Sequence, residues 1–410
     1  MMTTFPLPLA ELLGHYGSFV IYFLIGIAFG AVLEMAGFGN SRKLAAQFYF
    51  QDMTVLKVMF SAIVVAMVMI FFATAVGLLD YNLIWVNPTY LWPGIVGGLI
   101  MGAGFIIGGF CPGTSLVAAA TLKKDGIMFV LGVLAGIFVF GETIDNFAVF
   151  WNSSYMGRFT LPELFGLPTG VVVVGVVIMA LIMFWGAEKL EQRFGDKDPS
   201  AAPKWRYAAA GTLLAGAFAV MLIGQPTMLD RWARIADEKD LVLEERQVQI
   251  HPGELLEKLH DTQLKVIMLD VRDEVDYNLF HILDSQHVPL EELPDHIAEL
   301  HLQPENTLFV TMSNDEEKAT EAWKILEAES VPNVYILDGG INNWLATFGE
   351  DDLTKNFNVG AGSDVFCYIF DTAVGSNNVA SEPDPHAYEL EYTPKVKMEL
   401  KRAPASGGCG

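Results

Sequence analysis

Cysteine and basic side chains are scarce in this sequence. Its 410 residues include three widely spaced cysteines, Cys111, Cys367 and Cys409. Three scattered cysteines are too few for a disulfide scaffold or a four-ligand zinc site, and we expect no metal and no cofactor. The 25 lysines and arginines are outnumbered by 48 aspartates and glutamates, and 35 of these acids follow Asp230. An acidic domain cannot neutralise phosphates, which excludes nucleic acid as a partner.

Long apolar runs fill residues 1–228. A helix needs about 20 apolar residues to cross the hydrocarbon core of a bilayer. Six segments are long enough or nearly so: Ser18–Ala36, Val55–Leu79, Leu91–Phe110, Ile127–Phe140 with its continuation, Leu167–Ala187 and Tyr207–Ile223. The opening segment, Met1 to Tyr16, lacks the basic residues of a signal peptide, so we expect the first helix to be retained. The sequence therefore predicts a multi-pass membrane domain of about six helices, surrounded by lipid.

Basic residues in the short loops orient these helices. The loops after the first, third and fifth segments contain Arg42, Lys43, Lys57, Lys123, Lys124, Lys189, Arg193, Lys197, Lys204 and Arg206. The other short loops contain only Arg158. The positive-inside rule places the three basic loops in the cytoplasm and both termini outside the inner (plasma) membrane. After six crossings the acidic C-terminal part would face the periplasm, and one further crossing would reverse this.

One part of the membrane domain aligns with another after a shift of 72 positions. Gly37-Phe38-Gly39 then falls on Gly109-Phe110-Cys111, and similar residues align on both sides. Each copy has a long helix, a Gly-Phe loop, a short helix and a second long helix. The short apolar stretch Ser115–Leu122 is predicted to be a re-entrant half-helix, because it is too short to span. The predicted segments are residues 21–80 and 93–150 for the two copies, and 167–187 and 207–223 for two extra helices.

Paired interrupted helices are typical of the binding site of a transporter, although glycines in membrane helices also allow close packing. In the second loop, Pro112 suits the first turn of a helix and leaves Cys111 at the N-cap. The N–H groups of the following residues would point outward and form an anion site. The alternative for Cys111 is a small buried hydrophobic residue. The predicted substrate-binding residues are Cys111, Pro112, Gly113, Thr114 and Ser115 in the second loop, and Gly39, Asn40 and Ser41 in the first.

The segment Gly37–Val64 and the Gly-Phe-Cys-Pro-Gly-Thr loop resemble the YeeE/YedE membrane family over about Ile21–Phe140. This resemblance implies transport of thiosulfate or a related small sulfur anion, with loop cysteines contacting its sulfur. Gly39 stands where the first loop of the family usually has cysteine. The chain resembles one half of a full-length family transporter, which implies a homodimer or a partner half-transporter.

Glu34 lies about one helical turn before Gly39. An ionisable residue inside a membrane helix is a candidate for function. Glu34 could couple protons to transport, or it could hydrogen-bond a neighbouring helix.

Strands and helices alternate from Gln247 onward, which predicts a small α/β domain with a parallel sheet. The expected strands are Lys265–Asp270, Thr307–Thr311 and Val334–Leu337, and the expected helices are His251–Asp261, Glu316–Ala328 and Ile341–Thr347. Residues 229–246 are predicted to be a linker before this domain.

Two motifs in residues 247–350 resemble the rhodanese (sulfurtransferase) family: Leu269-Asp270-Val271-Arg272 and Leu337–Trp344. The resemblance places the family's nucleophilic cysteine at Ser313, or at Met312 after a slip of one residue. The loop from Met312 to Lys318 contains no cysteine, and its acidic side chains disfavour an anionic sulfur. We therefore expect no enzyme activity, and a domain that binds sulfur or docks a sulfurtransferase or sulfur-carrier partner.

Residues 351–410 form a C-terminal extension outside both resemblances. Val365–Phe370 is expected to add a strand with Cys367 in a core, and Gly375–Pro385 to be a linker. The final Gly407-Gly408-Cys409-Gly410 resembles the carrier arm of SoxY-type periplasmic proteins, which implies that Cys409 bears sulfur. A Cys367–Cys409 disulfide and an incidental tail remain alternatives.

Membrane transport of a sulfur anion is the function that these features favour. The alternative is a membrane-anchored sulfur carrier or docking protein that transports nothing. An active sulfurtransferase is a third reading, which the loop without cysteine disfavours.

Overall fold

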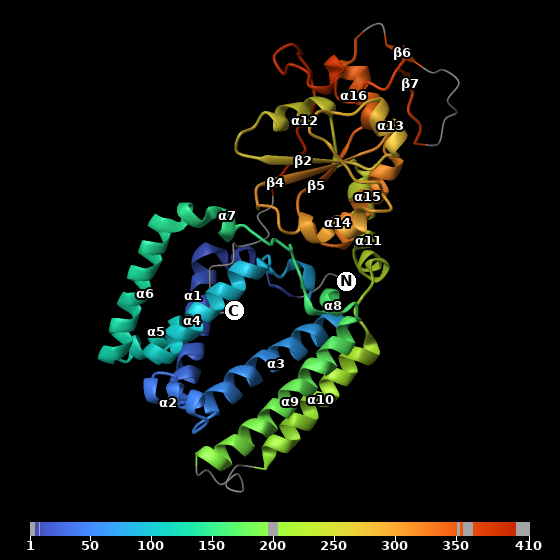
Figure 1. Ribbon diagram of the computed structural model, residues 1–410. Coiled ribbons are helices and arrows are strands. Elements are labelled where there is room, and N and C mark those ends of the chain that lie inside the picture. The colour runs from blue at the N-terminus through green and yellow to red at the C-terminus, as the bar shows by residue number, and fades with distance from the viewer. Residues whose placement is uncertain (1–4, 8, 196–203, 351–352, 356–363, 399–410) are drawn as a thin grey trace. The chain divides into compact units, whose positions relative to one another are not determined.

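The computed structural model describes residues 5–7, 9–195, 204–350, 353–355 and 364–398. The chain forms two compact units, which we call the membrane unit (Thr3–Gln225) and the soluble unit (Pro226–Pro404) (Figure 1). Each is described separately below.

Six helical segments of the described chain are long and apolar enough to span a membrane, which confirms the number predicted from the sequence. They are Leu12–Met35, Thr54–Ala75, Leu91–Ala120, Lys124–Trp151, Thr169–Phe194 and Trp205–Ile223. The third consists of two helices, α4 (Leu91–Gly108) and α5 (Pro112–Ala120). The predicted half-helix Ser115–Leu122 corresponds to α5, which begins three residues earlier and ends two residues earlier. The other spans contain α1 (Leu9–Met35), α3 (Thr54–Ala75), α6 (Lys124–Thr143), α9 (Thr169–Phe194) and α10 (Trp205–Ile223).

The order long helix, short helix, long helix occurs twice in the membrane unit. The first copy is α1, α2 (Ser41–Ala45) with the 3-10 turn η1 (Ala46–Tyr49), and α3, and the second copy is α4, α5 and α6. The copies exchange contacts, since α1 packs on α5 and α2 packs on α4. Helices α3, α9 and α10 form a separate group, with a core that includes Val64, Val173 and Val220.

The soluble unit is built on a parallel five-stranded sheet with the order β1-β5-β4-β2-β3. Strands β2 (Lys265–Asp270), β4 (Thr307–Met312) and β5 (Val334–Leu337) match the predicted strands. The edge strands β1 (Gln249–Ile250) and β3 (Gln286–His287) were not predicted, because two residues are too few for a periodic pattern.

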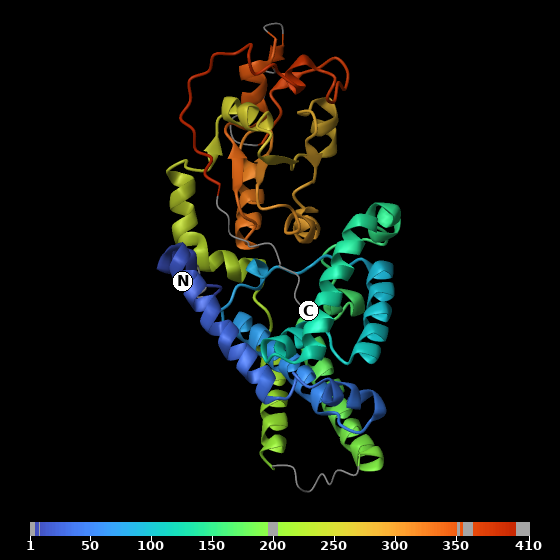
Figure 2. The same cartoon turned by 90° about the vertical axis from the view of Figure 1, so that its left-hand side faces the viewer.

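Helices cover both faces of this sheet (Figures 1 and 2). Alternate strand residues point to opposite faces, so Met268 joins one core and Leu269 the other. The first core also contains residues of α12 (Pro252–Leu259) and α16 (Gly340–Phe348), and the second contains residues of α14 (Leu293–Leu300) and α15 (Glu317–Ala328). The remaining helix, α13 (Glu274–Leu279), follows β2.

The predicted linker before this domain is helix α11 (Met228–Glu244), which packs on α15. Arg231 pairs with Glu329 at 2.5 Å, and Trp232 meets Trp323 edge-on with ring centroids 6.3 Å apart. The helix begins at a capping box formed by Thr227 and Asp230. The segment is rich in charged residues, and for that reason it was predicted to be a linker and not a helix.

The extension after residue 363 is packed against the α/β domain. The indole of Trp344 donates to the carbonyl oxygen of Ala380 at 2.7 Å, and the N–H of Leu283 donates to Ser381 at 3.0 Å. The prediction that Gly375–Pro385 is a linker is therefore wrong. Further along, the fully buried carboxylate of Glu254 accepts from the N–H groups of Lys395 and Val396, both at 2.8 Å. The expected added strand exists as β7 (Tyr368–Ile369), paired with β6 (Thr354–Lys355).

Candidate functional site

The two Gly-Phe loops of the membrane unit lie against each other. Phe38 and Phe110 are both fully buried and belong to one apolar cluster with Leu44 and Ala118. Gly109 has a φ of +71°, and a Cβ added there would lie 3.1 Å from the Cβ of Ser41. The repeat therefore brings its two helix breaks together.

In each loop, a backbone N–H group donates to a carbonyl oxygen of the helix that precedes the loop. Gly37, at a φ of +83°, ends α1, and the N–H of Phe38 returns to the carbonyl oxygen of Leu33 at 3.0 Å. Gly109, at a φ of +71°, ends α4, and its own N–H donates to the carbonyl oxygen of Phe105 at 2.8 Å. On the other side of the first break, Asn40 caps α2 by accepting from the N–H of Arg42 at 3.1 Å.

Cys111 is the N-cap of α5 and Pro112 is its first residue, as the sequence predicts. The sulfur accepts from the N–H of Thr114 at 3.5 Å and lies 3.3 Å from the Thr114 hydroxyl oxygen. That hydroxyl in turn accepts from the N–H of Cys111 at 2.9 Å, which completes a capping box.

The prediction that the N–H groups after Cys111 point outward is wrong for Thr114 and Ser115, because both make hydrogen bonds within the helix end. The N–H of Thr114 is bound by the Cys111 sulfur, and the N–H of Ser115 donates to the Cys111 carbonyl oxygen at 3.0 Å. The serine hydroxyl also turns inward, to the carbonyl oxygen of Pro112 at 2.7 Å. Cys111 itself is partly exposed, and its sulfur lies at this helix end with the partial positive charge of the helix terminus behind it. Gly113 lies in the same first turn.

Gly39 in the first loop is buried, and charged side chains occupy the space where its side chain would be. A Cβ added to Gly39 would lie 2.5 Å from Glu34 Oε2 and 2.8 Å from Lys123 Nζ. Glu34 and Lys123 form an ion pair with a separation of 3.5 Å. A second contact runs from the Ser41 hydroxyl to Asp125 Oδ2 at 3.0 Å. Sequence reasoning missed Lys123 and Asp125 as parts of this site.

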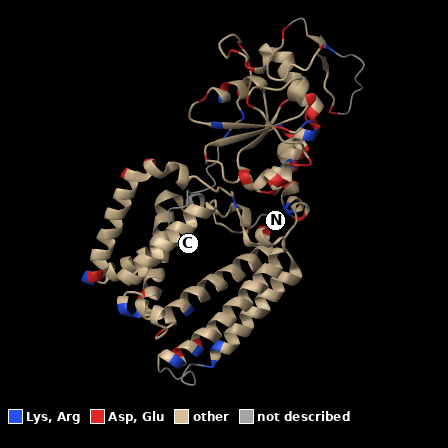
Figure 3. Cartoon of the chain, in the orientation of Figure 1, with Lys and Arg blue, Asp and Glu red and all other residues tan. Residues whose placement is uncertain are grey.

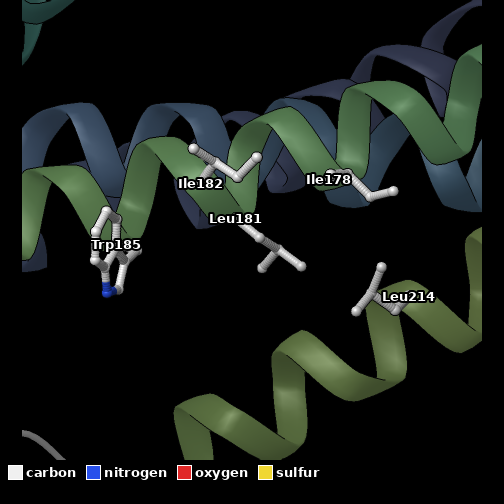
Figure 4. A pocket seen from close by; sticks show the side chains of 5 residues that line it. All are labelled: Ile178, Leu181, Ile182, Trp185 and Leu214. Carbon is white, nitrogen blue, oxygen red and sulfur yellow. The ribbon is translucent and has the colours of Figure 1, made fainter.

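The hollow in Figure 4 is a poor candidate for an anion site. Its side chains come from α9 and α10 and are Ile178, Leu181, Ile182, Trp185 and Leu214. This lining is apolar apart from the indole N–H, so it cannot compensate a buried negative charge.

In the soluble unit, Ser313 follows β4 and is fully buried. Its hydroxyl accepts from the N–H of Ala319 at 3.1 Å, and its carbonyl oxygen accepts from the N–H of Ile341 at 2.9 Å. Gly340 packs so closely on this loop that an added Cβ would lie 2.0 Å from the Asp315 carbonyl oxygen. The loop is therefore held firmly between α15 and α16.

The C-terminal extension occupies the open side of this loop. Asp364 Oδ1 accepts from the N–H of Asp315 at 2.8 Å, and the Asn314 side-chain amide donates to the Asp364 carbonyl oxygen at 2.9 Å. Two hydrogen bonds of 2.9 Å join the Asn342 side chain to Val365 and Cys367. The extension thus places its own carboxylate on a loop N–H group.

The structure describes one of the two cysteines of the C-terminal part. Cys367 is partly buried and packs beside the first core of the soluble unit, as expected. Cys409, the predicted sulfur carrier, lies outside the described residues.

Comparison with known families identifies both parts. Residues 35–235 match the family described as sulphur transport, and residues 251–347 match the rhodanese-like domain. The chain is a sulphur-transport domain followed by a rhodanese-like domain. The YeeE/YedE and rhodanese resemblances are thereby confirmed, whereas the resemblance of residues 407–410 to a carrier arm stays a prediction. The protein is a multi-pass membrane protein with a sulphur-transport family domain.

Among solved structures, the solution NMR structure of a rhodanese-like domain from Anabaena sp. is 22% identical, with a TM-score of 0.23. The match covers 30% of this chain and 93% of that domain. Comparison with curated proteins gives no match.

The contact between Asp364 and the rhodanese-like loop should weaken as the pH rises. Burial and the neighbouring Asp315 carboxylate raise the pKa of Asp364 from 3.8 to about 6. A raised pKa means that the docked extension favours the protonated acid, so docking is strongest below the ordinary pKa and loosens until the pH exceeds about 6. Amide hydrogen exchange of residues 365–370 should therefore show less protection at neutral pH than in mild acid.

The comparison is made with Asp364→Asn, because its neutral amide keeps an acceptor for the Asp315 N–H and does not titrate. Measuring both proteins at each pH removes the pH dependence of chemical exchange. Asp371→Asn, at an exposed position on the same segment, should behave as wild type. Equal pH dependence in wild type and Asp364→Asn would contradict the assignment.

Proposed function

We propose that the sulphur-transport domain moves thiosulfate or a related small sulfur-containing anion across the membrane, with Cys111 contacting the sulfur of the substrate. The observation that supports this most directly is the place of Cys111, at the N-cap of a half-helix where two broken helices meet. A helix N-terminus favours negative charge, and a cysteine there gains affinity for polarisable partners.

Uptake of sulfur-labelled thiosulfate into vesicles that contain the purified chain tests this role. Cys111→Ser keeps a good N-cap, because serine is among the preferred residues at that position, but it removes the sulfur. Losing a contact of roughly 1.4 kcal/mol lowers affinity about tenfold, so Cys111→Ser should raise the KM for uptake by at least about that factor. Cys111→Ala should be no better, and Cys367→Ala should match wild type.

Normal uptake by Cys111→Ser would overturn the sulfur contact. No uptake by well-folded wild-type protein would instead favour a partner half or the alternative of a membrane-anchored carrier. That alternative predicts additional sulfur mass on Cys409 without flux.

A homodimer would complete the pathway in this proposal. In the most apolar part of the fourth span no residue is buried within the chain, whereas 39% of the residues are buried in that of the fifth. Gly132 and Gly136 of α6 have nothing near the position of an added Cβ, so another helix can approach closely. Light scattering in detergent should give the mass of two chains, and a monomer that transports would contradict this.

The rhodanese-like domain would bind sulfur or dock a partner without catalysing sulfur transfer. A buried serine follows β4, and the loop N–H at Asp315 already has a carboxylate partner. Serine cannot carry the persulfide that such transfer requires. Incubation with thiosulfate and cyanide should give no more thiocyanate than the buffer, and thiocyanate that disappears in Ser313→Ala would refute this proposal.

The soluble unit would lie in the periplasm. Figure 3 shows most lysines and arginines of the membrane unit at one end of its helices, which the positive-inside rule assigns to the cytoplasm. A membrane-impermeant maleimide should then label Cys409 in spheroplasts without permeabilisation, with Cys409→Ser as the background. Labelling that requires permeabilisation would reverse the orientation.

A further inference from the structure

The space beside Gly39 contains a positive and a negative group from opposite copies of the repeat. Glu34 belongs to the last turn of α1, and Lys123 is the N-cap residue of α6, just beyond α5. A methyl group added to Gly39 would lie within 3 Å of both charged groups, so the ends of these two side chains would have to shift. The charged ends of both side chains therefore lie directly beside Gly39.

The pair is accessible and weakly held. The Lys123 and Glu34 side chains are 39% and 43% exposed, and their charged atoms are 3.5 Å apart. An exposed ion pair at this distance contributes little to stability, since solvent screens it and both long side chains lose freedom. A competing anion can therefore replace the carboxylate at small cost.

Two other lysines of the membrane unit, Lys43 and Lys57, have partners at the ends of helices. Lys43 donates to the carbonyl oxygen of Ala36 at 2.8 Å, which satisfies the end of α1. Lys57 pairs at 2.5 Å with Glu191, a buried carboxylate that also accepts from the N–H of Met53 at 2.7 Å. Both lysines thus serve helix ends, whereas Lys123 points at the loop itself.

Gly39 and Cys111 occupy equivalent positions of the two copies. The helix after Cys111, α5, has nine residues. The helix after Gly39, α2, has only five residues, so its macrodipole is small. A negative solute that leaves water needs a compensating charge. Lys123 is the group placed to supply that charge at the first loop.

We propose that Lys123 is the cationic contact for the transported anion at the first Gly-Phe loop, and that Glu34 is the counter-ion that the anion displaces. The proposal rests on the transport function proposed above. Glu34 keeps Lys123 neutralised while the site is empty, and the arriving anion takes over the ammonium group. Lys123 thereby determines affinity, and Glu34 competes with the substrate.

Opposite effects of two charge-removing variants test this exchange. Lys123→Gln should raise the KM for thiosulfate uptake at least about tenfold, the factor expected for roughly 1.4 kcal/mol. Glu34→Gln should lower the KM several-fold, because it removes the competitor and retains the ammonium. Lys123→Arg should restore most of the affinity, and Lys124→Gln, an exposed neighbour, should match wild type.

An ion pair that only joins the two copies of the repeat predicts another result. Lys123→Gln and Glu34→Gln would then change uptake in the same direction, together with the melting temperature, and this would overturn the proposal. An unchanged KM in Lys123→Gln would also overturn it while leaving the transport function intact. Absence of uptake by the wild-type chain counts against transport by this chain alone and would affect every variant equally, so the two failures are distinguishable.

Discussion

Two helices that break inside a membrane must satisfy their freed backbone groups without help from lipid. Here glycines at positive φ turn the chain, and the loop N–H groups return to the ends of α1 and α4. Side chains cap the helices that follow, with Asn40 at the first break and Cys111 at the second. The sulfur therefore accepts a hydrogen bond from the helix that follows, which fixes its position before any substrate arrives.

The need to satisfy backbone N–H groups also accounts for the contact between the C-terminal extension and the rhodanese-like loop. A loop that follows a parallel strand and precedes a helix presents backbone donors, and in this chain the Asp364 carboxylate accepts one of them. The extension that supplies Asp364 is anchored over a long stretch, from the Asn342 side chain to the buried carboxylate of Glu254. Its docking is therefore part of the domain fold, and the titration of Asp364 modulates only the contact at the loop.

Local patterns in the sequence predicted the elements that local physics determines. Apolar run length gave the six spans, Pro112 gave the start of α5, and continuous apolar strands gave β2, β4 and β5. Contacts between distant segments carry no such pattern. Glu34 and Lys123 are 89 positions apart, and Asp364 reaches its loop from outside the family motifs, so neither contact was foreseen.

The difference between Gly39 and Cys111 bears on what this site can recognise. Two equivalent cysteines would offer an anion the same soft contact twice. This chain instead has one sulfur, at a helix N-terminus, and in the other loop a buried glycine beside the Lys123 ammonium group. Thiosulfate has unlike ends, a polarisable sulfur and a group of hard oxygens. On the function proposed above, two unlike contacts match these ends, whereas sulfate would find a partner only at Lys123.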